Sequence, residues 1–290
     1  MSRLYGTPMA FRTALEERLK NFSRTHGVDL HKLRRQVAFD RLLCRLFGSH
    51  PGNLFLKGGY SMELRIQKAR TTKDIDLVFK AKTPAKREAG DQEIFDLLQA
   101  AASRDMNDFF VFLVGNPTLD LEAVPYGGSR FPVEAHLDGR LFIRFPMDVV
   151  VSSMVLEPVE AVGSQNWLEF AGIKTTPFPT ISREQQFAEK LHAYTLPRDD
   201  NENSRVKDIV DLLLLKRSGT LRTDFLATAI GKIFEYRGTH ALPDGLADPP
   251  SNWDSKFNRL AKDCGIETAL DTAFDELRSF FSQIKAKPNE

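Results

Sequence analysis

Apolar residues recur at helical spacing between residues 9 and 48. In the second half of this range they form one stripe, which comprises Val37, Leu42, Leu43, Leu46 and Phe47. The stripe ends before Gly48, and Pro51 follows, and both residue types commonly terminate helices. The pattern therefore predicts two leading helices.

Two strand patterns follow, with a pair of glycines between them. Residues 53–56 form a short apolar run that leads into Gly58 and Gly59, and a helix is expected at residues 62–66. Across residues 74–79 polarity alternates strictly, which is typical of a strand. The alternation places Ile75, Leu77 and Phe79 on one face and Asp74, Asp76 and Val78 on the other.

A β-hairpin is predicted at residues 130–137 and 140–152. These segments flank Asp138 and Gly139, a dipeptide that strongly favours a tight turn. In the second arm, apolar residues share one parity; they are Leu141, Ile143, Phe145, Met147, Val149 and Val151. Because side chains alternate along a strand, Asp148 is expected on the opposite face.

The remaining pattern divides the chain into an α/β part and a helical part. A helix around residues 91–103 leads into a strand at 109–114, as in a β-α-β element. The later helices are expected from Ser182 to Pro197, from a Ser204 cap to Gly219, at residues 222–237, and twice more after a loop at residues 243–250. We therefore expect an α/β (α+β) domain at residues 1–180 and an α-helical domain at residues 181–290.

Composition narrows the class of protein. The 290 residues are 42% hydrophobic and 27% charged, which is typical of a globular chain. No apolar run reaches the ~18 residues that cross a bilayer, and the N-terminus lacks the apolar core of a signal peptide. We therefore expect a cytoplasmic protein with no membrane partner. Cys44 and Cys264 lie in helical patterns and are expected to be reduced core residues.

Charge is balanced overall but concentrated locally. The formal net charge is +1, so any electropositive surface must be local. From Lys57 to Arg87 there are nine basic residues and three acidic ones. This segment is either a surface for nucleic-acid phosphates or an ordinary solvated face.

Asp74 and Asp76 form the strongest candidate for metal binding. Carboxylates two residues apart on a strand project from the same face, roughly 6 to 7 Å apart at the backbone. Such a pair can hold the divalent ions that assist phosphoryl transfer. The alternative is an exposed strand face that happens to carry two acids. Asp148, on a later strand, would complete a set of three, unless it too is simply an exposed acid.

The turn before this strand offers groups for a phosphate. Lys57 precedes Gly58 and Gly59, whose backbone N–H groups can approach a phosphate closely, and Ser61 adds a hydroxyl. The alternative is a turn that needs glycine for its geometry alone. Because only a short predicted helix separates the turn from Asp74 and Asp76, both are expected at one end of one sheet.

Four segments together resemble a known family. They are LKGGYS at residues 56–61, RTTKDIDL at 70–77, FAEKLHA at 187–193 and RVKDIVDL at 205–212. They are similar to the motifs of AbiEii-like nucleotidyltransferase toxins of type IV toxin-antitoxin systems, which include MenT-like toxins, within the polymerase-β-like superfamily. The resemblance covers roughly residues 35 to 220 and implies a mixed sheet with flanking helices, followed by an α-helical domain. Tyr60 departs from it, because a small residue is common at that position.

The resemblance implies roles for residues in the helical half. Lys190 would contact the nucleotide triphosphate as a point charge, and Asp211 would orient Lys190 or contact the base or ribose. Asp208, three residues before Asp211, is either a nucleotide contact or a favourable charge in the first turn of its helix.

The activity that the resemblance implies is transfer of a nucleoside monophosphate from an NTP to an acceptor hydroxyl, with Mg²⁺, or alternatively Mn²⁺, as cofactor. The acceptor expected is the 3′ end of tRNA, with inhibited translation and growth as the result and a separately encoded antitoxin as partner. A nucleotide- or partner-binding protein without turnover, and transfer to a protein or small molecule, remain alternatives. Thr71 and Thr72 beside the acids are candidate phosphorylation sites.

Other catalytic classes lack their usual motifs. The sequence contains no G-x-x-x-x-G-K-[ST], no G-x-G-x-x-G and no H-E-x-x-H. No serine occupies a G-x-S-x-G elbow, and Cys44 lies on an apolar helical stripe. P-loop, Rossmann, zinc-protease and common hydrolase chemistry are therefore not expected.

Overall fold

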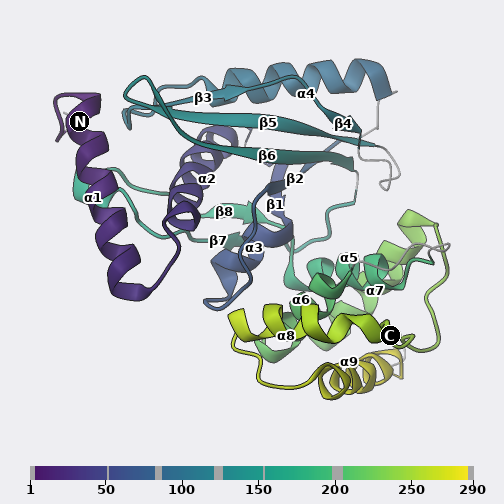
Figure 1. Cartoon of the computed structure of the whole chain (residues 1–290). Helices are drawn as coiled ribbons and strands as arrows, with labels where there is room; N and C mark the ends of the chain where they lie inside the picture. Colours follow the sequence, from purple (N-terminus) through teal and green to yellow (C-terminus); the bar gives the residue numbers. More distant parts are fainter. Residues whose placement is uncertain are drawn as a thin grey trace. The chain divides into compact units, whose positions relative to one another are not determined.

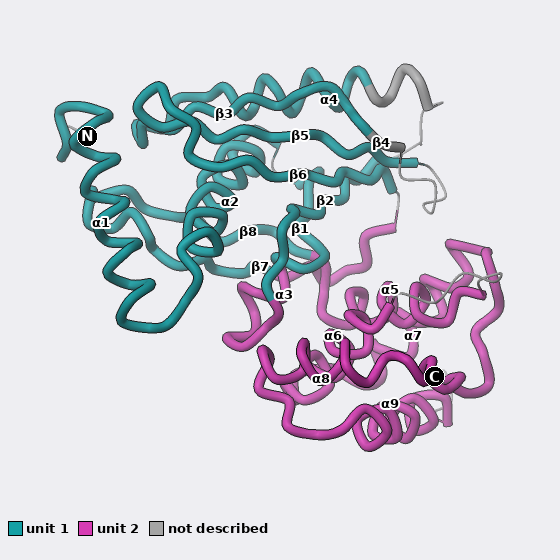
Figure 2. Tube along the Cα trace, in the orientation of Figure 1, with its two compact units in different colours: residues 1–60, 71–153, 161–180 teal, residues 61–70, 154–160, 181–290 magenta. Residues whose placement is uncertain are grey.

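The computed structural model describes residues 4–50, 52–81, 87–120, 127–152, 154–197 and 205–286. The chain forms two compact units (Figure 2). The first comprises residues 1–60, 71–153 and 161–180, and the second comprises residues 61–70, 154–160 and 181–290. Two short segments that precede residue 181, namely 61–70 and 154–160, thus belong to the unit that contains the C-terminal helices.

A mixed β-sheet forms the centre of the first unit. Within the described residues it contains eight strands, in the order β3-β5-β6-β2-β1-β8-β7, with β4 paired to β5. Their bounds are β1 Leu54–Lys57, β2 Ile75–Lys80, β3 Phe110–Val114, β4 Leu119–Asp120, β5 Gly128–Leu137, β6 Arg140–Ser152, β7 Glu160–Val162 and β8 Phe178–Thr180. The pairs β2–β6 and β1–β8 are parallel, whereas β1–β2, β3–β5, β4–β5 and β5–β6 are antiparallel. The expected mixed sheet is confirmed.

Helices cover one face of this sheet. The first unit contains α1 Pro8–His26, α2 Leu30–Ser49 and α4 Arg87–Ala102, and Figure 1 shows α4 running along β3. Phe39 of α2 packs edge-on against Phe145 of β6, and Phe95 of α4 stacks on Phe131 of β5. The odd-numbered residues of β5 and of most of β6 are therefore buried beneath these helices. The opposite face of the same strands carries the even-numbered residues, which include Asp148.

Most local predictions are confirmed, with small shifts in the elements of the first unit. The two leading helices are capped by Thr7 and Asp29, whose side chains accept from backbone N–H groups. Strand β2 begins at Ile75, so Asp74 directly precedes it, and α3 (Gly58–Arg65) begins at the glycines themselves. The hairpin has the predicted turn, with positive φ at Asp138 and Gly139.

The predicted parity of β6 is wrong at one position. The register shifts between the pairs Ala135–Ile143 and His136–Leu141, so Phe142 is an extra residue on β6, as in a β-bulge. Leu141, expected in the core, is therefore 40% exposed, and Phe142 is buried instead.

The second unit is predominantly helical. It contains α5 Arg183–Thr195, α6 Val206–Arg217, α7 Thr223–Arg237, α8 Asp254–Asp263 and α9 Leu270–Lys285 around one apolar core. Ser182 caps α5 by accepting from the N–H of Gln185, as the capping pattern predicted. The Ser204 cap and the basic residues Lys82 and Lys86 lie outside the described residues.

Two further sequence predictions concern the cysteines and the membrane. Cys44 and Cys264 are both buried and neither forms a disulfide, as expected for reduced core residues. No helix in the described part of the chain combines the length and the apolar character that a bilayer span requires.

Candidate active site

Four charged residues form a row across one face of the sheet in the first unit. Lys57 of β1 is the register partner of Asp76 of β2, Asp76 is the partner of Asp148 of β6, and Asp148 is the partner of Arg130 of β5. Register partners on adjacent strands project from the same face. The row therefore places two carboxylates side by side at its centre, with a cation at each end.

Asp76 lies in a strongly perturbed electrostatic environment. Burial, together with the negative charges of Asp74 and Asp148, raises its pKa to about 6, although Lys57 and an N–H group oppose the shift. That N–H belongs to Gly59 and lies 3.3 Å from Asp76 Oδ2. Clustered carboxylates that disfavour one another's charge are what a divalent cation stabilises.

Asp74 accepts a hydrogen bond from a residue two positions before it in the chain. The hydroxyl of Thr72 donates to Asp74 Oδ1 at 2.5 Å, and Thr72 is itself buried. Thr72 is therefore a positioning partner of a candidate metal ligand. Thr71, the other candidate phosphorylation site, is exposed.

Asp148 lies on the predicted face, but both of its oxygens are engaged. Arg130 Nε and Nη2 donate to Asp148 Oδ1 and Oδ2, each at 2.7 Å. This pair raises the pKa of the Arg130 guanidinium, so Arg130 remains charged. Among the described residues no three acidic, histidine or cysteine side chains converge as a ready-made metal cage. The acids fit a divalent ion by their chemistry, and the structure shows Asp148 held by Arg130 instead.

The two glycines are required by their packing against the acids. Gly58 has a φ of +65°, and a Cβ there would lie 1.8 Å from Asp76 Oδ2. A Cβ at Gly59 would lie 2.6 Å from the hydroxyl oxygen of Thr72. Any larger residue would displace the carboxylate or the threonine that positions Asp74.

Tyr60 is buried behind this turn. Its hydroxyl donates to Asp40 Oδ1 at 2.5 Å, and its ring packs edge-on against Phe39. Burial raises the pKa of Asp40 to about 7. The residue that departs from the family pattern therefore anchors the glycine turn to α2 in this chain.

Ser61 belongs to the second unit and is fully buried. Its Oγ accepts from Gln186 Nε2 of α5 at 2.8 Å. The hydroxyl that we expected near a phosphate thus supports α5 in this structure, and its contact with a nucleotide stays a prediction.

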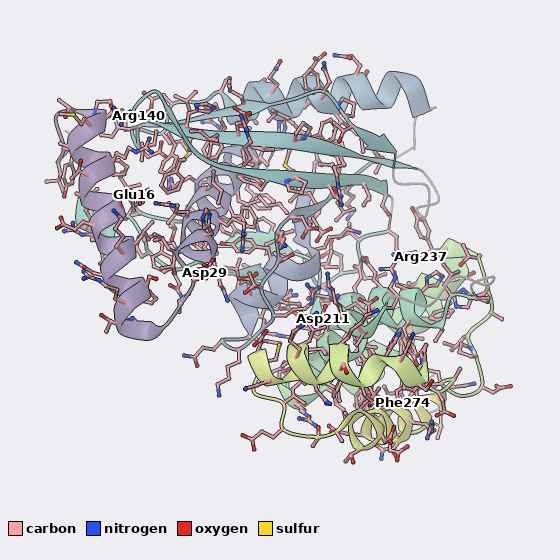
Figure 3. All side chains as sticks on the ribbon, viewed as in Figure 1. Glu16, Asp29, Arg140, Asp211, Arg237 and Phe274 are labelled. Atoms are coloured by element: carbon pink, nitrogen blue, oxygen red, sulfur yellow. The ribbon has the colours of Figure 1, made fainter. Side chains whose placement is uncertain are left out.

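A second charged cluster surrounds Asp211 on α6, which is labelled in Figure 3. Lys190 Nζ of α5 lies 2.5 Å from Asp211 and 3.3 Å from Asp208. Arg70 donates to both oxygens of Asp211, with Nη2 2.9 Å from Oδ2. Burial alone would lower the pKa of Lys190, but the two carboxylates outweigh it and raise the pKa. Burial would likewise raise the pKa of Asp211, but Lys190 and Arg70 lower it. The structure thus brings Lys190, Asp208 and Asp211 together, with Asp211 in contact with Lys190 as the family resemblance implied.

Arg130 and Arg70 were missed as members of these clusters. Arg70 lies within a quoted motif, but its partner Asp211 is 141 residues away in sequence. Counting back from the hairpin turn pairs Asp148 with Ser129, and only the extra residue at Phe142 moves Arg130 opposite Asp148. A bulge of this kind leaves no clear sequence signal.

A family model and one solved structure, that of MenT4, agree with this fold. The family model of the nucleotidyl transferase AbiEii toxin of type IV toxin-antitoxin systems matches residues 41–279. The structure of MenT4, a nucleotidyltransferase toxin from Mycobacterium tuberculosis H37Rv, is similar with a TM-score of 0.57 and 15% identity, over 93% of this chain and 90% of that one. JHP933 from Helicobacter pylori aligns over 89% of this chain and 98% of that one, with a TM-score of 0.45 and 13% identity. Comparison with curated proteins gave no match.

The family model spans most of the chain and includes both clusters of candidate residues. The match to MenT4 independently shows the same fold over nearly the whole of both chains. The mixed sheet with flanking helices and the helical second unit are those expected for such a protein. The chain therefore belongs to the AbiEii family of nucleotidyl transferase toxins of type IV toxin-antitoxin systems.

Proposed function

We propose that this chain transfers a nucleoside monophosphate from an NTP to a hydroxyl of an RNA acceptor. The hydroxyl oxygen forms a bond to the α-phosphorus and gives up its proton to solvent. The bond between the α-phosphorus and the oxygen that bridges to the β-phosphate breaks, and pyrophosphate leaves with the displaced electron pair. The observation that carries the proposal is the register pairing of Asp76 with Asp148, next to Asp74, on one sheet face. Three carboxylates in this arrangement suit the divalent ions used in phosphoryl transfer.

We assign Asp74, Asp76 and Asp148 as the ligands of a divalent cation, Mg²⁺ or Mn²⁺. The raised pKa of Asp76 supports the assignment, because a cation would relieve the repulsion that raises it. When bound, such an ion would activate the attacking hydroxyl and neutralise charge on the leaving phosphate. Arg130 must release Asp148 for the third carboxylate to take part, since it occupies both oxygens.

The remaining roles concern the nucleotide. We assign Lys57 and the N–H groups of Gly58 and Gly59 to the phosphates, with Ser61 as a supporting residue of the same turn. Lys190 is assigned to the triphosphate, and the raised pKa supports this because Lys190 keeps its charge at neutral pH. Asp211 holds Lys190 in place and Asp208 gives a second contact.

The acceptor that we propose is the 3′ end of tRNA. Membership of a family of nucleotidyl transferase toxins supports it, because loss of usable tRNA would stop translation and growth. The family also supports a separately encoded antitoxin as partner. The exposed Lys68 and Lys73, within the positively charged segment, offer contacts for RNA phosphates.

The decisive experiment incubates purified protein with total tRNA, Mg²⁺ and each α-labelled NTP in turn, beside an Asp76→Ala variant. We expect label in RNA with the wild type and a loss on the order of 100-fold or more in the variant, as for a lost metal contact. Label that enters protein instead would show that the acceptor is a protein and not tRNA. No label in any product would overturn the proposed transfer.

A second candidate is a protein that binds nucleotide without turnover. The observation in its favour is the Arg130–Asp148 pair, which keeps the third carboxylate from a metal ion. Calorimetry with an NTP and Mg²⁺ separates the two candidates. Binding heat without pyrophosphate release, in the presence of tRNA, would favour binding alone.

A further inference from the structure

The face that carries Asp76 and Asp148 continues along the β5–β6 hairpin. Beyond the Arg130–Asp148 pair, the next pairs on this face are Pro132–Pro146 and Glu134–Arg144. Helices α2 and α4 pack on the other face, through Phe39 and Phe95. The segment next to the candidate metal ligands is therefore a distinct surface of the first unit.

A cavity of about 330 Å³ lies over these pairs. It is lined by Thr118, Arg130, Pro132, Glu134, Arg144 and Pro146, together with parts of two neighbouring residues. The volume lies at the lower end of the ~300–1,000 Å³ that is usual for small-ligand sites. Arg130 is shared, because it lines the cavity and its guanidinium binds Asp148. The cavity therefore adjoins the candidate metal ligands through one side chain.

The lining combines three chemical features. Pro132 and Pro146 provide rigid apolar side chains without a charge. Arg130 and Arg144 provide cations, with side chains 36% and 67% exposed. Glu134 accepts from Arg144 Nε at 2.7 Å and adds an acceptor group to the lining. A nucleotide matches this combination, because it has a flat base, donors and acceptors on the edge of that base, and an anionic phosphate.

We propose that this cavity binds the acceptor nucleotide next to the reacting 3′ end. The base lies on Pro132 and Pro146, its polar edge meets Arg144 and Glu134, and its phosphate pairs with Arg130. This inference rests on the proposed function, since it assumes an RNA acceptor. It adds an acceptor subsite that consists entirely of first-unit residues and lies outside the family-like motifs.

Arg130 also couples acceptor binding to the carboxylates. A phosphate in the cavity competes with Asp148 for the bidentate guanidinium, since both anions accept the same pair of parallel hydrogen bonds. When the phosphate takes Arg130, both oxygens of Asp148 become free. Asp148 therefore becomes available to a metal ion only when the acceptor RNA is bound. By thermodynamic linkage, a divalent ion on Asp148 must in turn favour RNA binding.

The test measures binding of a short fluorescent RNA with a free 3′ hydroxyl, with and without Mg²⁺. In Pro132→Glu, a negative charge in the cavity lining should weaken RNA binding roughly 10-fold or more, the scale of one lost stacking contact. Val111→Glu is the matched control, because it adds the same charge on a 57% exposed residue of β3 outside the cavity. Its RNA affinity should equal that of the wild type. Arg144→Ala, at an exposed side chain, is a second variant that should bind RNA more weakly without affecting the fold.

The outcomes separate this inference from the proposed function. If the wild type labels RNA but Pro132→Glu and Arg144→Ala bind RNA as the wild type does, the subsite is overturned and the proposed function stands. If both variants lose RNA affinity but keep NTP affinity by calorimetry, the subsite is supported. An equal loss in Val111→Glu would overturn it, because the effect would then be one of general charge. Label transferred to a protein acceptor, and reduced by the same two variants, would overturn the assignment to a nucleotide.

Discussion

Asp76 and Asp148 are register partners on the adjacent parallel strands β2 and β6, so two carboxylates project side by side from one sheet face. Like charges placed directly opposite one another destabilise a sheet. Lys57 and Arg130 flank the pair in the same row and offset part of this repulsion. Ionisation of both carboxylates therefore lowers the free energy of unfolding of the first unit.

Asp76→Asn should change how the free energy of unfolding depends on pH. Because the pKa of Asp76 is raised to about 6 in the folded state, the folded protein binds more protons than the unfolded chain between about pH 4 and pH 6. Wild-type stability should therefore fall as pH rises through this window, by up to about 3 kcal/mol. The substituted asparagine cannot ionise, so the variant should lack this loss and yet be inactive in transfer.

Urea unfolding at pH 4.5 and pH 8, with EDTA present, measures the difference directly. The variant should gain stability relative to the wild type at the higher pH. If the free energy of unfolding depended on pH equally in both proteins, ionisation of Asp76 would not be the cause of the loss of stability. Adding Mg²⁺ at pH 8 should stabilise the wild type more than the variant, because binding to the folded state shifts unfolding.

Arg130→Gln should strengthen binding of a divalent ion in the absence of RNA. The guanidinium occupies both oxygens of Asp148, and glutamine cannot form the bidentate ionic pair. Titration with Mn²⁺, followed by electron paramagnetic resonance, would show a lower dissociation constant for the variant. Arg144→Gln is the control, since Arg144 pairs with Glu134 instead. Weaker Mn²⁺ binding in Arg130→Gln would contradict the view that Arg130 competes with the ion.

Gly58→Ala should abolish transfer, whereas Gly27→Ala should not. Both glycines have a φ near +65°, so each alanine carries a backbone strain of about 1–2 kcal/mol. A Cβ at Gly27 meets no atom within 4 Å, but one at Gly58 would lie 1.8 Å from Asp76 Oδ2. Unfolding free energies and labelled transfer, measured on both variants, separate strain from displacement of the carboxylate. Retained transfer in Gly58→Ala would contradict the tight packing of this turn against Asp76.

Local sequence patterns predicted the helices and strands but not the tertiary contacts between them. The α5 cap at Ser182 and the apolar stripe of α2 depend on residues close in sequence, so they could be recognised directly. Strand parity also placed Asp148 on the face opposite Met147 and Val149. Its position beside Asp76 depends on the parallel pairing of β2 with β6, which lie far apart in the chain.

The partners of the site residues could not be predicted for the same physical reason. Arg130 faces Asp148 only because β6 contains one extra residue at Phe142, and a bulge depends on packing of the whole sheet. Burial of Ser61 against Gln186 follows from the tertiary packing of α5. The motif residues that resemble a family could be named from sequence, whereas their ion pairs required the fold.

Lys190→Met and Arg70→Met should cost similar stability but differ in nucleotide affinity. Both side chains pair with buried Asp211, and removing one partner of a buried ion pair costs about 3–5 kcal/mol. If Lys190 contacts the triphosphate, only its loss should also remove a charge from the nucleotide and raise the NTP dissociation constant by roughly tenfold or more. Arg70→Met is the matched control, because it leaves Lys190 in place.

Calorimetry with an NTP at a temperature where both variants remain folded provides the comparison. A purely structural cluster would weaken nucleotide binding equally in Lys190→Met and Arg70→Met, because each leaves Asp211 with a single cation. If only Lys190→Met lost NTP affinity, this lysine would have to contact the nucleotide as well as Asp211. Lys190→Arg should keep the charge but not the compact ammonium geometry, so it should restore stability more completely than nucleotide affinity.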